Sequence, residues 1–305
     1  MTARHGAGRP VGFVGLGRIG APMATRLLDR PGGLVVFDVD PAATAPFAER
    51  GATVASSPAD LARQVGVVSL MVRDDAQVEA VVAGPDGLLS TAAPGTVIAI
   101  HSTVEADTPA RIAALAAPHG VEVVDAPVSG GAMGAHAGDL AFLVGGSDGA
   151  VEVAREAFAP MAGLVAHLGP VGAGTRAKLA RNLVTFASFA AVGEAVRLAE
   201  AAGLDPAVLG EVVRHTDRLT GGPGAIMLGQ RPGPLAADDG LRPIFEHTRA
   251  LGEKDLDLAL GLGADLDVDL PVAALARRLL AGALGVAPDG AEDPGDADDP
   301  GGTDR

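Results

Sequence analysis

The sequence has no cysteine, no tryptophan and no tyrosine, and it contains only 8 phenylalanines among 305 residues. The absence of cysteine excludes disulfides, thiolate zinc sites, iron–sulfur clusters and a cysteine nucleophile. Basic residues are also scarce, since 23 Lys and Arg stand against 38 Asp and Glu, for a formal net charge of −15. Nucleic-acid binding needs a positive surface and often uses aromatic stacking. We therefore expect no nucleic-acid partner.

Long hydrophobic runs and paired metal ligands are missing too. The most apolar late stretch, residues 270–287, is interrupted by Arg277 and Arg278 and is too short for a transmembrane helix. No secretory signal is recognisable near the start. The histidines show no H-x-H or H-x-x-x-H spacing, so no metal site is expected. These absences predict a cytoplasmic protein without membrane contact.

Hydrophobic residues make up 48% of the chain, and its length is typical of two domains. Over residues 1–168, short apolar runs alternate with helical segments. Runs of valine, isoleucine and leucine are typical of parallel strands that are covered on both faces. The expected strands are 11–14, 34–37, 65–72, 96–100, 121–125 and 140–144. This order predicts an α/β dinucleotide-binding domain with a doubly wound, Rossmann-type sheet.

After residue 169 the composition becomes helical. Residues 174–201 predict one long interdomain helix of about 40 Å. Ser57-Pro58 and Asp205-Pro206 are typical helix starts, because a capping side chain precedes a proline. Further helices are expected over 205–216, 243–261 and 271–284, after a Gly/Pro-rich break at 221–240. We predict an all-helical substrate and oligomerisation domain over 169–286, and a disordered acidic tail over 287–305.

The segment Gly15-Leu16-Gly17-Arg18-Ile19-Gly20 is a G-x-G-x-x-G motif between a predicted strand and a predicted helix. Gly15 allows a tight turn, Gly17 lets a pyrophosphate approach the backbone, and Gly20 lets the helix pack on the strand. Asp38 ends the next strand, where a carboxylate binds ribose hydroxyls and repels a 2′-phosphate. No Lys or Arg follows within residues 39–47. We therefore expect NAD as cofactor, in preference to NADP.

Three separated motifs resemble the β-hydroxyacid dehydrogenase family, which includes 3-hydroxyisobutyrate dehydrogenase. They are residues 12–24 around the glycines, the segment Asp125-Ala126-Pro127-Val128-Ser129-Gly130-Gly131, and the G-x-x-x-K-x-x-x-N pattern of residues 174–182. A later Lys254-Asp255-Leu256 resembles the family's segment near the cofactor. The resemblance covers residues 11 to about 275. It implies a C-terminal domain like that of 6-phosphogluconate dehydrogenase.

Some positions depart from the family pattern. Thr25 stands where the family usually has Asn, and Val72-Arg73 stands where it usually has Leu-Pro. Asp139 follows Gly138 where Thr is usual, which is expected to place another carboxylate near the site. These departures leave the substrate open.

Hydride transfer needs a proton relay at the alcohol oxygen and an oriented substrate. Gly174, Lys178 and Asn182 are spaced i, i+4 and i+8, so they share one helix face. We expect Lys178 to move the proton, Asn182 to hydrogen-bond the lysine or the substrate, and the small Gly174 to let a ligand approach. Burial beside a positively charged nicotinamide is expected to lower the lysine pKa and to favour alcohol oxidation at alkaline pH.

The loop Ser129-Gly130-Gly131 offers backbone N–H groups and a hydroxyl, which suit a substrate carboxylate. The resemblance implies that Thr103 faces both nicotinamide and substrate, and that Phe245 forms a wall of the substrate site. Further cofactor contacts are expected from Met71, Val72 and Lys254. His101 is open to two interpretations, an acid–base group or a packed side chain.

The leading hypothesis is an oxidoreductase that transfers a hydride between NAD(P) and a small, carboxylate-bearing 3-hydroxy acid or its semialdehyde. One alternative is an imine reductase on the same fold, against which Lys178 argues, since those relatives usually lack this lysine. Another is a dinucleotide-binding protein without turnover. One small helical layer cannot cover the long apolar helix, so a homodimer or homotetramer is expected.

Overall fold

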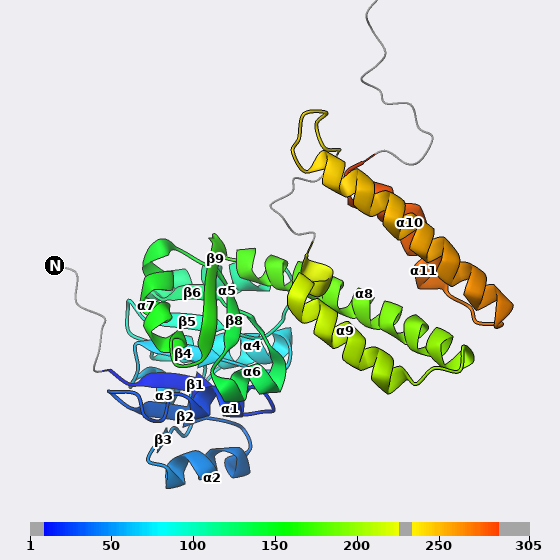
Figure 1. Cartoon of the computed structure of the whole chain (residues 1–305). Coiled ribbons are helices and arrows are strands. Elements are labelled where there is room, and N and C mark those ends of the chain that lie inside the picture. Colours follow the sequence, from blue (N-terminus) through cyan, green and yellow to red (C-terminus); the bar gives the residue numbers. More distant parts are fainter. Residues whose placement is uncertain (1–8, 226–233, 287–305) are drawn as a thin grey trace, which may run out of the picture. The chain divides into compact units, whose positions relative to one another are not determined.

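The computed structural model describes residues 9–225 and 234–286, which belong to two compact units, Met1–Asn182 and Leu183–Arg305 (Figure 1). The expected domain boundary, at 168/169, precedes the long helix α8 (Ala173–Ala201), whereas the units divide inside this helix. Its first turns therefore belong to the N-terminal unit. The expected acidic tail, 287–305, lies outside the described residues. Among the described helices, none is long and apolar enough to cross a membrane.

The N-terminal unit is built on one sheet with the order β3-β2-β1-β4-β5-β6-β8-β7, and β9 pairs with β8. Pairing is parallel from β3 through β6, while β8 runs antiparallel to β6 and β7. The strands are β1 (Val11–Val14), β2 (Leu34–Phe37), β3 (Thr53–Val54), β4 (Val67–Leu70), β5 (Val97–Ile100), β6 (Glu122–Asp125), β7 (Val128–Ser129), β8 (Leu140–Gly145) and β9 (Ala162–Gly169). The doubly wound sheet predicted from the sequence is confirmed.

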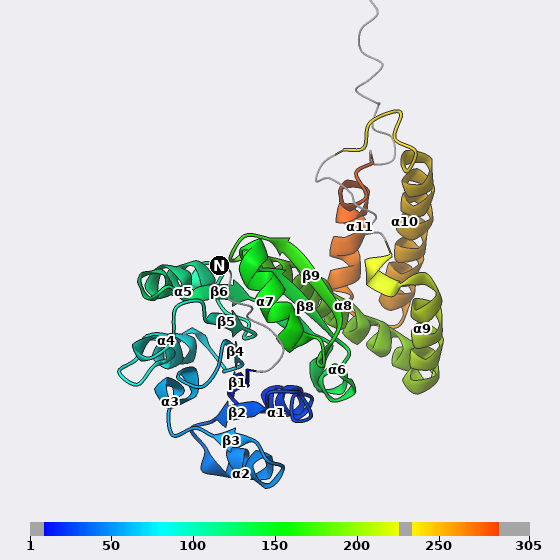
Figure 2. The same ribbon diagram turned by 90° about the vertical axis from the view of Figure 1, so that its left-hand side faces the viewer.

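Helices cover both faces of this sheet, as Figure 2 shows. One face packs on α3 (Pro58–Ala62), α4 (Asp75–Ala83) and α5 (Thr108–Ala116). The other packs on α1 (Gly20–Thr25), α2 (Pro41–Glu49), α6 (Gly131–Ala137) and α7 (Asp148–Phe158). Strand residues serve the two layers alternately, because successive side chains point to opposite faces. Phe13, for instance, belongs to the second layer and Val14 to the first.

The predicted helix starts are confirmed by their capping bonds. Ser57 accepts a hydrogen bond from the Asp60 backbone N–H at 3.1 Å, with Pro58 in the first turn. Asp205 accepts one from the Ala207 N–H at 2.8 Å, ahead of Pro206. Each cap satisfies a backbone donor that the first helical turn leaves free.

The C-terminal unit is helical, as expected. Besides the later part of α8 it contains α9 (Pro206–Thr220), α10 (Arg242–Asp265) and α11 (Pro271–Ala283). Glu194 of α8 is buried, and its carboxylate accepts hydrogen bonds from the Val272 and Ala273 N–H groups at 2.6 and 2.9 Å. This carboxylate caps α11 and joins it to α8. The α10–α11 pair carries a small core around Phe245 and Leu284.

Candidate active site

The carboxyl ends of five parallel strands meet at one edge of the sheet. Val14 pairs with Phe37 and Leu70, Leu70 with Ile100, and Ile100 with Asp125, so β1, β2, β4, β5 and β6 end level with one another. Ligands bind at this edge in doubly wound folds. Most of the site residues predicted from the sequence follow directly after these strand ends.

The glycine loop after β1 has the geometry that the motif predicts. Gly15 has a φ of +92°, and a Cβ there would lie 2.1 Å from the Met71 carbonyl oxygen. A Cβ on Gly20 would lie 2.0 Å from the Gly15 carbonyl oxygen, so the turn and α1 need both glycines. Gly17 is exposed and has open space where a Cβ would project. No neighbouring protein atom would clash with a side chain at this position. A pyrophosphate that approaches the backbone here would clash with one, which explains the glycine.

Asp38 lies beside this loop. Its Oδ2 accepts a hydrogen bond from the Leu16 N–H at 2.6 Å, and its Oδ1 accepts one from the Asp40 N–H at 2.9 Å. Arg18 is exposed and Ile19 is half-buried at the start of α1. The carboxylate thus fixes the loop to the end of β2 and keeps lone pairs for ribose hydroxyls.

The loops after β4 and β5 are joined by a serine to which sequence reasoning gave no separate role. Ser102 Oγ donates to the Val72 carbonyl at 2.7 Å and accepts from the Val72 N–H at 3.0 Å. Met71 and Val72 are half-buried, and Thr103 is exposed at the end of β5. These three residues are therefore brought to the same edge of the sheet, and the backbone of Val72 is held in place.

His101 is a packed side chain. It is 1% exposed, and its ring lies 5.4 Å from the rings of Phe142 and Phe158, measured between centroids. Nδ1 lies 2.9 Å from the Ala126 carbonyl oxygen and donates to it. Burial lowers the pKa of the imidazole to about 4, so the ring is neutral at pH 7. Its place in the core leaves no route to a substrate proton.

The Ser129–Gly131 loop combines one buried hydroxyl-bearing residue with two exposed glycines. Ser129 pairs with Ala141 of β8, which fixes it at the sheet. Gly130 and Gly131 have φ values of +132° and +61°, conformations that glycine adopts at little cost. Exposed backbone N–H groups next to a serine can receive a carboxylate. Asp139 lies just before β8, and its carboxylate oxygen Oδ1 lies next to Gly163 of β9.

Asp125 has a role that sequence reasoning missed. Its carboxylate is fully buried and accepts hydrogen bonds from the Gly172 and Thr175 N–H groups, both at 2.6 Å. These donors belong to the start of α8, so the end of β6 holds the first turn of that helix. The available signal was a charged residue at the end of a buried strand within the second motif.

Lys178 and Asn182 lie on the helix face that this anchor orients. Lys178 is 9% exposed and Asn182 is half-buried, whereas Leu179 and Arg181 are exposed. Burial lowers the pKa of the Lys178 ammonium below its ordinary value, and the positive charge of Arg181 lowers it further. Among residues 9–225 and 234–286, no carboxylate forms an ion pair with Lys178.

The expected role of Gly174 is wrong. A Cβ at this position would lie 2.1 Å from the Leu143 carbonyl oxygen and 2.7 Å from that of Asp125. Gly174 therefore lets α8 pack directly on the backbone of β8, and it does not open space for a ligand.

Phe245 and Lys254 lie in the C-terminal unit. Phe245 is 3% exposed and packs in a small core with Leu284 and Val286, and its expected part in a substrate wall stays a prediction. Lys254 is exposed and forms an ion pair of 3.1 Å with Asp255.

Comparison with known proteins places this geometry in a family. Residues 10–169 match the model for the NAD-binding domain of 6-phosphogluconate dehydrogenase. Residues 172–293 match the NAD-binding domain of NADP-dependent 3-hydroxyisobutyrate dehydrogenase. The two matches together cover most of the chain.

Individual proteins similar to this chain are also oxidoreductases. The chain is 54% identical over 286 residues to an uncharacterized oxidoreductase of Mycobacterium tuberculosis, covering 94% of this chain and 96% of that protein. It is 39% identical over 273 residues to the NAD-dependent L-serine dehydrogenase of Pseudomonas aeruginosa, covering 89% and 91%. A crystal structure of an oxidoreductase from Mycobacterium avium 104 matches with a TM-score of 0.86 and 52% identity, covering 90% and 98%.

The fold and the strand-end site define an NAD(P)-dependent oxidoreductase, and they fit a dinucleotide at the open Gly17 and at Asp38. The chain belongs to the β-hydroxyacid dehydrogenase family. The resemblance noted from the sequence motifs is thereby confirmed.

Proposed function

We propose that this protein is a dehydrogenase of a small 3-hydroxy acid, which in the reverse direction reduces the corresponding semialdehyde. The observation that carries this proposal is Lys178. It is a buried ammonium group with a lowered pKa, on a helix that a buried carboxylate anchors to the sheet. An amine held in this way suits proton transfer, because its neutral form is accessible nearer to neutral pH.

Each residue has a defined part in this proposal. When bound, the nicotinamide supplies the chemistry of accepting a hydride from the alcohol carbon or returning it. Lys178 takes the hydroxyl proton during oxidation and gives a proton back during reduction. Asn182, about one helical turn further along α8, hydrogen-bonds the lysine or the substrate oxygen. Ser129 and the N–H groups of Gly130 and Gly131 hold the carboxylate, and Thr103 orients the reacting carbon.

The substrate class follows from shared chemistry. Relatives at 39% and 36% identity are named for L-serine and 3-hydroxyisobutyrate. Both molecules carry a primary alcohol on the carbon next to the one that bears the carboxylate. In this skeleton a single carbon separates the alcohol carbon from the carboxylate carbon, and we assign the alcohol to Lys178 and the carboxylate to Ser129. We propose that the substrate of this protein shares that skeleton.

We further propose NAD as the preferred cofactor. Asp38 places a negative charge beside the glycine loop, which repels a 2′-phosphate. Assays with NAD and NADP at equal concentration compare kcat/KM directly. A tenfold or greater preference for NADP contradicts this assignment.

A panel of 3-hydroxy acids tests the proposed activity, with wild type compared with Lys178→Ala. We expect turnover of at least one member by wild type, loss of turnover in the variant, and NADH binding retained by both. NADH binding without turnover of any substrate favours the non-catalytic alternative. Turnover confined to imines favours the imine reductase alternative; imine reductases at 19% identity share this fold, and the likeness shows no more than that.

We also propose that the protein is a homo-oligomer formed through its helical unit. The α8 residues Leu183, Phe186, Phe189 and Val192 are 71%, 60%, 64% and 53% exposed, and each adjoins the next on the helix surface because residues three apart are neighbours there. Contiguous apolar side chains exposed on a surface, as in this stripe, mark interaction sites. A second copy, related by symmetry, presents the same stripe.

A further inference from the structure

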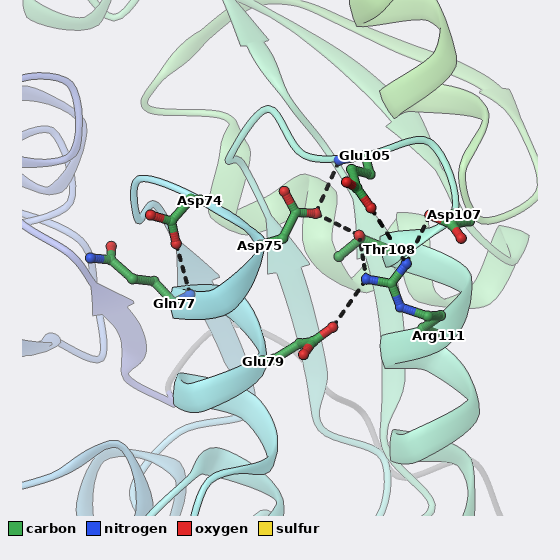
Figure 3. Close-up of polar contacts among 8 residues, drawn as sticks. All are labelled: Asp74, Asp75, Gln77, Glu79, Glu105, Asp107, Thr108 and Arg111. Carbon is green, nitrogen blue, oxygen red and sulfur yellow. Dashed lines mark hydrogen bonds and ion pairs between the residues drawn. The ribbon is translucent and has the colours of Figure 1, made fainter.

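A cluster of polar side chains joins helices α4 and α5, which begin at the same edge of the sheet as the candidate site (Figure 3). Asp75 lies in the first turn of α4. Its Oδ1 accepts a hydrogen bond from the Glu105 N–H at 3.0 Å and another from the Thr108 hydroxyl at 2.5 Å. Thr108 is the first residue of α5 and is fully buried. One carboxylate oxygen of α4 thus holds both the end of the β5–α5 loop and the start of α5.

Arg111 strengthens the same junction from the other side. It donates to Asp107 at 2.8 Å, to Glu79 of α4 at 3.0 Å, and to the Thr108 hydroxyl at 2.9 Å. The Thr108 hydroxyl therefore accepts from Arg111 while it donates to Asp75. The guanidinium joins α5 to α4, one helical turn beyond Asp75.

The loop closed in this way carries site residues. It runs from His101 to Asp107 and presents Thr103, while Ser102 at its start binds both backbone polar groups of Val72. Two sets of hydrogen bonds therefore join the segments that follow β4 and β5. Ser102 makes one set next to the strands, and Asp75 makes the other next to the helices. Neither set is local, since Ser102 and Val72 are 30 positions apart and Asp75 and Thr108 are 33 apart.

These hydrogen bonds relate to the Val72-Arg73 pair, which stands where the family usually has Leu-Pro. A proline after the strand end would restrict the backbone of this loop. Arg73 keeps an N–H, which donates to the Gln77 side chain at 3.0 Å, and Asp74 caps α4 through the Gln77 N–H at 2.9 Å. Hydrogen bonds in this loop supply order that a proline would otherwise provide.

We propose that Asp75 is a positioning residue for the reaction, acting through the β5–α5 loop to hold Thr103 and Val72 in place. The inference rests on the proposed function, in which Thr103 orients the substrate, and on the cofactor contact expected of Val72. Without Asp75, the loop loses both hydrogen bonds to that carboxylate and keeps the Ser102 contact and the Arg111 contacts at Asp107, so it gains conformational freedom at Thr103. Orientation is then lost where the reacting groups meet.

Asp75→Ala tests the proposal, with Asp60→Ala as a matched control. Asp60 lies in the first turn of α3, and its Oδ2 also accepts from one backbone N–H and one hydroxyl, both of Ser56, at 2.9 and 3.1 Å. Its bonds stay within four residues of itself. We expect Asp75→Ala to lower kcat/KM by about tenfold, and Asp60→Ala to leave it within about twofold, at comparable Tm. Equal kcat/KM in the two variants overturns the proposal.

Two further variants separate positioning from unfolding. Asp75→Asn keeps an acceptor oxygen and is expected to recover most of the lost kcat/KM. Thr108→Val removes the hydroxyl at nearly constant shape and is expected to lower kcat/KM in the same direction as Asp75→Ala. Unchanged kcat/KM in Thr108→Val, or no recovery in Asp75→Asn at wild-type Tm, contradicts the assignment.

Hydrogen exchange keeps this test independent of the proposed activity. If wild type turns over no 3-hydroxy acid, the proposed function fails, and exchange of peptides covering residues 101–108 still reports on the hydrogen bonds of Asp75. We expect exchange there to be about tenfold faster in Asp75→Ala than in wild type and unchanged in Asp60→Ala. Unchanged exchange in Asp75→Ala shows that the carboxylate does not hold the loop.

Discussion

The protonation of one side chain, Lys178, links the structure to the proposed chemistry. Its pKa is lowered first by burial and then by the like charge of Arg181, three residues further along α8. A lowered pKa increases the neutral fraction of the amine at any pH below its ordinary value. Alcohol oxidation requires the neutral amine and therefore rises with pH through this pKa, whereas reduction requires the protonated form.

Replacing Arg181 by Gln tests the electrostatic part of this argument. Loss of a nearby positive charge makes the ammonium form easier to keep, so the pKa of Lys178 rises. We expect the ascending limb of the pH profile of kcat for oxidation to move to higher pH. Arg197→Gln, on the same helix but about 28 Å along it from Lys178, serves as control and should leave the limb in place. A limb that moves to lower pH in Arg181→Gln contradicts the assigned cause.

At the scale of the element, the position of Lys178 depends on how α8 begins. Asp125 binds two N–H groups of its first turn, and Gly174 lets the helix backbone approach β8. Thr175 and Gly174 lie three and four residues before the lysine. The substrate loop starts from the same strand end, four residues after Asp125. The end of β6 therefore leads to both parts of the proposed site, through the hydrogen bonds of Asp125 to α8 and through the chain that continues to Ser129.

Gly174→Ala is expected to disturb this anchor. The added methyl would lie 2.1 Å from the Leu143 carbonyl oxygen, so α8 has to shift. We expect a loss of about 1–3 kcal/mol in the free energy of unfolding, measured in urea, and a lower kcat. Gly149→Ala in α7 is the control, because its methyl meets no atom within 4 Å. Wild-type stability and kcat in Gly174→Ala would show that the helix tolerates displacement.

Local sequence patterns predicted the elements that are locally determined. β1 and β2 were predicted with their observed bounds, and the caps at Ser57 and Asp205 were predicted from a few adjacent residues. β9 was not predicted, because it is a half-exposed strand between prolines 160 and 170 and owes its form to pairing with β8. The helix predicted directly after the glycine motif is α-helical only over Gly20–Thr25.

The same distinction applies to the site. The glycine loop and Lys178 were predicted, because each lies in a contiguous motif. The bonds that position them join residues far apart in sequence, such as Asp125 with Thr175, 50 positions apart. A single sequence carries no periodic signal for such pairs. Gly174 was misassigned for a related reason, since its neighbour across the interface is the backbone of β8.

At the scale of the whole molecule, the two units divide the work in the proposed function. The N-terminal unit contains the strand-end site and Lys178, and the C-terminal unit presents the exposed stripe of α8. Burial of that stripe in an oligomer would remove apolar side chains from water, which stabilises association. The rings of Phe186 and Phe189 lie 5.8 Å apart within it and form its aromatic centre.

Sedimentation velocity tests the oligomer at assay concentration. We expect a dimer or tetramer for wild type and dissociation of Phe186→Asp, because a charge buried in an apolar interface is strongly unfavourable. Val39→Asp, a change at an exposed residue of the N-terminal unit, should leave the assembly intact. A monomeric wild type contradicts the proposed oligomer.

The most direct test of the account is the rate of hydride transfer in a single turnover, followed by NADH absorbance in wild type and Lys178→Ala across a range of pH. The account predicts a wild-type rate that rises with pH, and a variant that binds NADH normally. In this variant, transfer should be slower by about 10²–10⁴-fold, the usual contribution of general acid–base catalysis, without the rising limb. A variant that keeps the rising limb, or a rate within threefold of wild type, would show that another group moves the proton.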